Sequence, residues 1–246
     1  MSDISDYLPK WTKKVITEGG GRDPLGLSRV AFLLADYLLT GIITTTERVR
    51  YYSFYTWALW NIEQEEKPKN YDEFAAAFRH REAVFALSSY AANPGASPVG
   101  VEVVRGQLDR GKQTGEYDCD FKVLPSNNMG GYGQYYGGSM YALKLTHRDE
   151  KGIDYATAGF GDELAAIFDQ SVQETRYVRG RGFLKNTIAE SDLQELQTCF
   201  TLDVINTDVA KNEREKLIEI FFGLNGTSID DKSVLRSQTL TILLHL

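Results

Sequence analysis

A dense run of aromatic residues in the first quarter of the chain restricts its fold more than any other feature. Six aromatic side chains occur within ten residues: Tyr51, Tyr52, Phe54, Tyr55, Trp57 and Trp60. In a helix each residue turns by about 100°, so these side chains would point in every direction around the axis. A helix that is apolar on every side is buried on every side. The run therefore predicts a central core helix, with a base- or ligand-stacking platform and a partner interface as the alternatives.

Start and stop signals on either side of this run predict a mainly α-helical, multi-helix globular domain. One helix is expected over 25–40, and Thr44 with Glu47 has the spacing of a capping box for a helix over 46–66. We expect these two helices to pack as an antiparallel pair. Further helices are expected at 70–92, 99–108, 161–172, 207–222, from 191 onward and from 230 to the last residue.

The expected β structure is small and lies near residues 117–155. Four residues alternate as in one strand: Tyr117, Cys119, Phe121 and Val123. The Gly/Tyr-rich run at 130–138 has too many glycines for a stable helix by propensity, so we expect a loop, or a helix held only by packing. Three regions follow from this pattern: an N-terminal helical region, a mixed region and an acidic C-terminal helical region, at 1–93, 97–175 and 176–246.

Charge and composition exclude several classes of protein. The 246 residues are 42% hydrophobic and carry a formal charge of −7, and residues 187–246 hold ten acidic and five basic residues. A strongly basic nucleic-acid footprint is absent, so any site for a polyanion must be local. Cys119 and Cys199 form neither a disulfide framework nor a zinc-ligand cluster. The acidic N-terminus is unlike a signal peptide and no long uncharged apolar stretch occurs, which predicts a cytoplasmic protein without membrane contact.

One short motif has the residues of a metal-dependent nuclease. Asp109, followed eleven residues later by Asp120-Phe121-Lys122, resembles the Asp…Asp/Glu-x-Lys pattern of restriction-type nucleases. In that family two carboxylates hold a divalent cation such as Mg²⁺ and the lysine orients the attacking water, which matches the preference of hard cations for oxygen ligands. The resemblance implies the same roles for Asp109, Asp120 and Lys122. The alternative is a solvated acidic loop without a metal.

Residues 128–168 resemble a winged-helix domain. The family order is a recognition helix, a hairpin wing and a further helix, and here Tyr132 to Leu143 would be followed by a wing tip at Asp149–Gly152. Gly161 and Leu164 keep the family spacing of the last helix. The resemblance implies a winged-helix subdomain whose wing could place Lys151 on DNA.

A glycine-containing basic stretch is the strongest candidate for anion binding. Arg176, Arg179, Arg181 and Lys185 are interspersed with Gly180 and Gly182. Amides freed by the glycines could approach a phosphate, and arginine binds phosphate with two parallel hydrogen bonds. The alternative is that these cations pair with the acidic residues of the last quarter and only organise the fold.

The two ends of the chain suggest a setting and a partner. The run from Gly20 to Val30, with the aromatic helix after it, resembles a group of uncharacterised bacterial proteins, which implies a bacterial setting. The last predicted helix has no stop signal, and its apolar residues need a surface to cover. We therefore expect it to dock on a protein partner or a second copy, or the chain to continue beyond residue 246.

These observations favour a non-catalytic binding or assembly module of the bacterial cytosol, with a local site for nucleic acid or for a protein partner. No cofactor or metal is expected under this interpretation. The alternative is the Mg²⁺-dependent nuclease using Asp109, Asp120 and Lys122.

Overall fold

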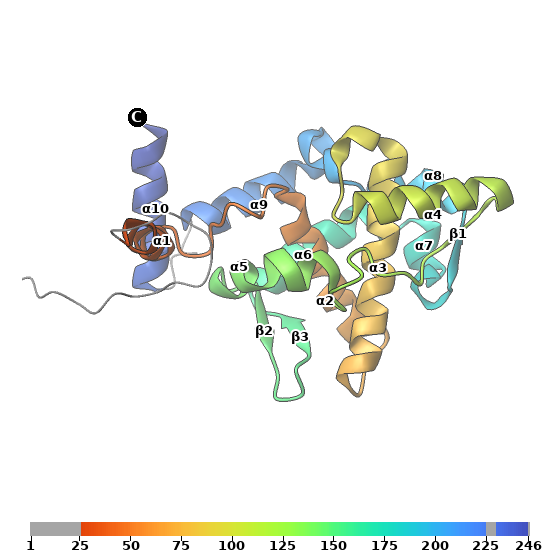
Figure 1. The fold of residues 1–246 in the computed structure, drawn as a ribbon, viewed down its shortest axis with the longest axis horizontal. Helices are drawn as coiled ribbons and strands as arrows, with labels where there is room; N and C mark the ends of the chain where they lie inside the picture. The colour runs from red at the N-terminus through yellow and green to blue at the C-terminus, as the bar shows by residue number, and fades with distance from the viewer. Residues whose placement is uncertain (1–25, 225–229, 246) are drawn as a thin grey trace, which may run out of the picture. The chain divides into compact units, whose positions relative to one another are not determined.

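The computed structural model describes residues 26–224 and 230–245, and its described part is mainly helical, as predicted. The chain divides into two compact units, Met1–Leu34 and Ala35–Leu246. Of the first unit only residues 26–34 are described, and they include the start of α1 (Leu27–Leu38). Figure 1 shows the ribbon. No described helix is both long enough and apolar enough to cross a lipid bilayer.

The aromatic run forms α2 (Arg50–Glu65), and its predicted burial is confirmed. Trp57 has no exposed surface, and only Trp60 of the six aromatic residues is partly exposed. The helix packs against α3 (Tyr71–Ala92) and α6 (Phe160–Val172). No residue of α1 is buried, and the expected pairing of α2 with the helix over 25–40 stays a prediction.

Local capping rules predicted some helix ends and failed at others. At the start of the helix predicted over 70–92, Asn70 caps α3 by accepting a hydrogen bond from the amide of Glu73, whose carboxylate accepts from the amide of Lys69. The capping box over 44–47 is wrong, because α2 begins at Arg50. The reason is tertiary: the Tyr136 hydroxyl donates to the carbonyl of Arg48 and accepts from its amide, and so holds that residue outside the helix.

The β structure is smaller than a continuous strand over 117–123. After α4 (Val101–Thr114), which extends beyond its predicted end at 108, β1 (Glu116–Asp118) pairs antiparallel with β4 (Thr187–Ala189). A second hairpin joins β2 (Thr146–Arg148) to β3 (Asp154–Ala156). These are the two sheets of the described residues, with two strands each.

The Gly/Tyr-rich run is helical rather than a loop, and packing holds it. It forms a π-helical segment, η3 (Tyr132–Tyr136), followed by α5 (Gly137–Ala142). Tyr132 and Tyr136 are buried in the core. At Gly130, which has a φ of +50°, a Cβ atom would lie 1.7 Å from Oε2 of Glu82. The glycine therefore permits a close approach that offsets its poor helix propensity.

The remaining described elements up to α9 (Lys211–Phe222) contribute to the same core, and the last helix packs on α9. Together these elements are short helices and turns, followed by two longer helices: α7 (Arg176–Arg179), η4 (Gly182–Leu184), α8 (Glu190–Leu196), η5 (Leu202–Asn206), η6 (Asp208–Ala210), α9 and α10 (Asp231–Leu244). η2 (Pro94–Ala96) follows α3. The core includes residues from all three predicted regions, so the boundaries at 93–97 and at 175–176 lie inside the second compact unit.

Candidate functional site

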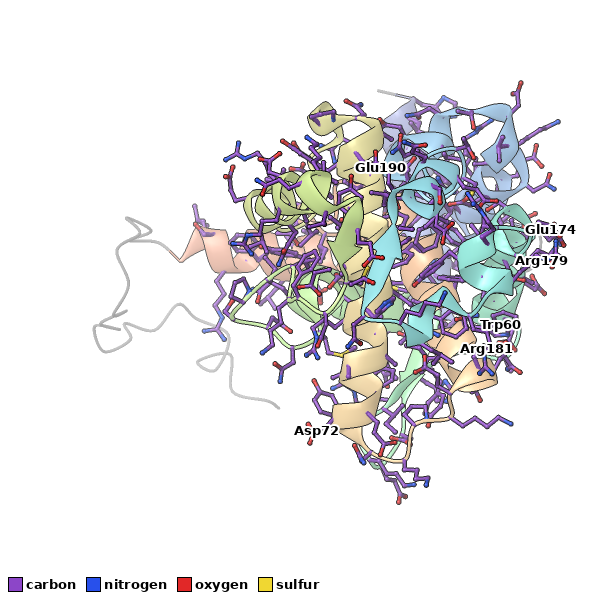
Figure 2. All side chains as sticks on the ribbon, turned by 90° about the vertical axis from the view of Figure 1, so that its right-hand side faces the viewer. Trp60, Asp72, Glu174, Arg179, Arg181 and Glu190 are labelled. Carbon is purple, nitrogen blue, oxygen red and sulfur yellow. The ribbon has the colours of Figure 1, made fainter. Side chains whose placement is uncertain are left out.

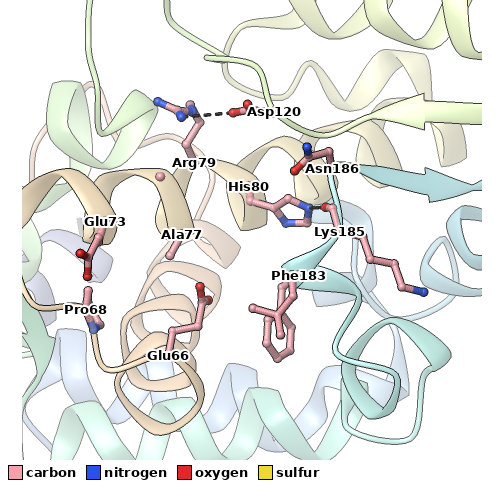
Figure 3. Close-up of a pocket in the computed structure, with 12 residues that line it drawn as sticks. Glu66, Pro68, Glu73, Ala77, Arg79, His80, Asp120, Phe183, Lys185 and Asn186 are labelled. Atoms are coloured by element: carbon pink, nitrogen blue, oxygen red, sulfur yellow. Dashed lines mark hydrogen bonds and ion pairs between the residues drawn. The ribbon is translucent and has the colours of Figure 1, made fainter.

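Two of the predicted site residues, Asp120 and Lys185, line one cavity of about 410 Å³ (Figure 3). Its walls come from the α2–α3 connection, the first half of α3, the segment after β1, and the segment from η4 to β4. Beyond these two residues, the lining includes Glu66, Glu73, Arg79, His80 and Phe183. The Lys185 ammonium group points away from Glu66 and Asp120.

His80 lies at the edge of this cavity and is neutral. Its Nε2 lies 2.6 Å from the carbonyl oxygen of Lys185, and its Nδ1 lies 3.2 Å from the hydroxyl of Tyr177. A carbonyl only accepts, so Nε2 donates and Nδ1 accepts the Tyr177 proton. Burial lowers the pKa of His80 to about 4. Both ring nitrogens are therefore occupied, and His80 fastens α3 to the basic stretch rather than supplying a free base.

Buried Arg81 makes a second set of contacts that connects the elements around the cavity. Its Nε and Nη2 donate to Oδ1 of Asn61 at 3.0 and 2.7 Å, and its Nη1 donates to Glu66 at 2.7 Å. The guanidinium also lies 4.4 Å from the ring centroid of Phe183. Arg81 thus joins α2, α3 and η4. Neither its role nor that of His80 could be inferred from spacing, because Phe183 and Tyr177 are about a hundred residues away.

The three arginines of the basic stretch each face a carboxylate. Arg176 contacts Asp192 at 3.3 Å and Glu195 at 3.0 Å, both within the acidic last quarter. Arg179 pairs with Glu174 at 3.3 Å, and Figure 2 shows the two side by side. Arg181 pairs with Glu65 of α2 at 3.1 Å. The positive charge of these arginines is therefore locally compensated.

The glycines of this stretch serve close packing. The amide of Gly180 donates to the carbonyl of Arg176, and the amides of Arg181 and Lys185 donate to carbonyls of Val178 and Gly182. A Cβ atom at Gly182 would lie 2.7 Å from the Tyr177 ring. The expectation that Gly180 leaves its amide free for a phosphate is therefore wrong.

The nuclease-like residues are not gathered at one place. Asp109 lies on α4, pairs with Lys112 at 3.3 Å and lines a different cavity from Asp120. Asp120 lies beyond the end of β1 and pairs with Arg79 at 3.1 Å. Lys122 donates to Asn128 at 2.6 Å. No group of three or more His, Cys, Asp or Glu residues that could hold a metal occurs among the described residues.

Residues 128–168 contain η3, α5, the hairpin β2–β3 and the start of α6, and their resemblance to a winged-helix domain stays a prediction. Lys151 lies in the tip between β2 and β3, where its amide donates to Asp149 at 2.9 Å. The segment that the resemblance places in the recognition position, 132–143, contains no Lys or Arg, and its tyrosines at 132 and 136 are buried.

The last helix presents an exposed apolar end. Its start is fixed by a capping box between Asp230 and Ser233. Buried Arg236 donates to the carbonyls of Ile220 and Phe221 at the end of α9, and to that of Thr40, at 3.0–3.1 Å. Three apolar side chains of the last turn are more than half exposed: Ile242, Leu243 and Leu244.

No protein-family model, curated protein or solved structure matches this chain.

Proposed function

We propose that this chain is a non-catalytic binding and assembly module that associates with a second copy of itself through the C-terminal half of α10. The observation that supports this most directly is the exposure of Ile242, Leu243 and Leu244, at 62, 52 and 72%. Their helix begins with a defined cap and is anchored by Arg236. An ordered helix with a contiguous exposed apolar end is typical of a surface that another protein covers.

The absence of charged residues at the C-terminal end of α10 favours the same apolar surface of a second copy as its partner. No Asp, Glu, Lys or Arg occurs from Ser237 to His245, so the surface offers no charge to a basic or acidic partner. Two copies of an uncharged apolar face are self-complementary when related by a two-fold axis. Burial of these side chains would supply the driving force.

The cavity of Figure 3 supports the non-catalytic part of the proposal. His80 has both ring nitrogens engaged, and the nearby Asp120 and Glu66 are paired with Arg79 and Arg81. A general base needs an available lone pair within reach of its proton. The compensated arginines of the basic stretch likewise favour a protein partner over nucleic acid, since phosphate binding would have to displace their carboxylates.

Sedimentation velocity over a range of concentrations tests the association. Wild type should form a reversible dimer, and Ile242→Ser combined with Leu244→Ser should be monomeric while keeping the wild-type circular dichroism spectrum. Val209→Ser removes an apolar side chain that is 61% exposed on η6, and this control should still dimerise. A wild type that stays monomeric at every concentration contradicts the proposal, as does a double variant that associates like wild type.

A further inference from the structure

A second cavity, of about 570 Å³, lies between the hairpin β2–β3, the second half of α2 and the start of α6. Its lining contains three carboxylates and three aromatic rings but no Lys or Arg: Trp60, Glu63, His147, Asp149, Tyr155 and Asp162. These groups come from five elements or turns that the fold brings together: α2, β2, the turn after β2, β3 and α6. The combination of negative charge with ring faces distinguishes this cavity from that of Figure 3, whose lining includes Arg79 and Lys185.

Asp149 differs from the other two carboxylates because it accepts hydrogen bonds from groups of the β2–β3 hairpin. Its Oδ1 accepts from the amides of Lys151 and Ile153 at 2.9 and 2.8 Å, and its Oδ2 accepts from the Tyr155 hydroxyl at 3.3 Å. The carboxylates of Glu63 and Asp162 form no ion pair or hydrogen bond within residues 26–224 and 230–245. Two uncompensated charges therefore face the same space as a third that is fixed in position.

The aromatic rings of the lining are a second feature, separate from the carboxylates, that favours a positively charged ligand. His147 and Tyr155 are opposite each other on β2 and β3, with ring centroids 5.5 Å apart and planes 24° apart. Trp60 joins the lining from α2, which packs on β3. Burial raises the pKa of Tyr155, and the charges of Asp149 and Glu63 raise it further, so the field at this ring is negative.

The ring faces distinguish one kind of cation from another. Aromatic faces attract ammonium and guanidinium groups and also contact their apolar stems. A hydrated divalent metal instead requires a shell of oxygen ligands. The described residues contain no cluster suited to a metal.

We propose that this cavity binds an organic cation, an ammonium or guanidinium group on an apolar stem. Glu63 and Asp162 pair with the charge, and the faces of Trp60 and Tyr155 contact the cation and its stem. The cation is carried either by a free polyamine or by a Lys or Arg side chain of a partner peptide. This binding does not depend on α10 and would occur in monomer and dimer alike.

Calorimetric titration of the full chain tests the site, with spermidine and a short arginine-containing peptide as separate probes. At least one probe should bind saturably, and an excess of Mg²⁺ at constant ionic strength should not displace it. Glu63→Gln combined with Asp162→Asn should weaken binding at least about tenfold, the effect of losing about 1.4 kcal/mol. Trp60→Leu should weaken it less, and thermal melts verify that each variant is folded.

Glu150→Gln is the matched control, because it removes one negative charge from the hairpin tip next to Asp149 but outside the cavity lining. It should change the affinity less than twofold. Binding of spermidine alone identifies a free ligand, and binding of the peptide alone identifies a partner side chain. The proposal is overturned if neither probe binds, if Mg²⁺ displaces the probe as an equal competitor, or if Glu150→Gln weakens binding as much as the double variant.

Discussion

At the scale of single residues, Glu82 is a buried carboxylate whose partners are all uncharged. Its Oε1 accepts from the Tyr55 hydroxyl at 2.7 Å and from the amide of Gly131 at 2.9 Å. Burial raises the pKa of Glu82 to about 7, because these hydrogen bonds offset only part of the lost hydration of the charged form. The residue joins α3 to the Gly/Tyr-rich segment.

This raised pKa predicts a stability that falls as pH rises. The unfolded chain releases the Glu82 proton near 4.5 and the folded chain near 7, so the contribution is complete below 4.5 and is lost between these values. The loss should be about 3 kcal/mol. Glu82→Gln mimics the protonated form, so urea unfolding between pH 5 and 7.5 should show a smaller decline than in wild type. Equal pH dependence in both proteins would show that Glu82 is not the titrating group.

Trp57 tests the burial of the aromatic helix. The side chain has no exposed surface, and its Nε1 donates to Asp169 at 2.8 Å. Trp57→Ala should lower the free energy of unfolding by about 3–5 kcal/mol, the usual range for a large core aromatic. Tyr141→Ala, at a side chain that is 61% exposed, should change it by less than about 0.5 kcal/mol. A loss below about 1 kcal/mol for Trp57→Ala would place the aromatic helix at the surface.

At the scale of elements, the Gly/Tyr-rich segment is a helix made of unfavourable residues. Gly130 has a left-handed conformation against Glu82, whereas Gly138 lies within α5 with open space around it. A side chain at position 130 would therefore clash with Glu82, whereas a side chain at position 138 would meet no other atom. The first glycine is required by a close approach, and the second contributes only flexibility to the unfolded chain.

Alanine substitutions should separate these roles. Gly138→Ala should raise the free energy of unfolding by about 0.5–1 kcal/mol, because alanine favours the helix. Gly130→Ala should lower it by more than about 2 kcal/mol, since Glu82 or the segment must move. Denaturant melts of the two variants measure both changes. If the two substitutions changed stability in the same direction and to the same extent, packing would not be what holds this segment helical.

At the scale of the whole molecule, the net charge of −7 and the local pairing of the arginines both disfavour binding to DNA. A fluorescence polarisation titration with a short DNA duplex at low salt should therefore show no saturable binding. Affinity for DNA grows with the number of phosphates neutralised, and the arginines already have carboxylate partners. Binding that weakened with salt and was reduced by Arg179→Ala with Arg181→Ala would instead support the winged-helix alternative.

Features that depend on neighbours within one or two helical turns were predictable from the sequence. The aromatic run had to be buried on all sides because its residues point in all directions around a helix, and α2 is buried in this way. The caps of α3 by Asn70 and of α10 by Asp230 depend on a side chain and an amide three residues apart. Such contacts are local, so spacing can indicate them where no distant contact intervenes, as the Tyr136 hydroxyl does before α2.

Only the tertiary structure decided the contacts between distant segments. Tyr117 pairs with Ile188, Tyr177 engages His80, and Glu82 holds Gly131, at separations of tens of residues that no periodicity encodes. The same holds for the basic stretch, where Arg181 lies against Glu65 of another helix. Sequence spacing shows which charges exist, but their neutralisation depends on which elements pack together. For that reason the helical class followed from the sequence, while the state of every candidate site depended on the fold.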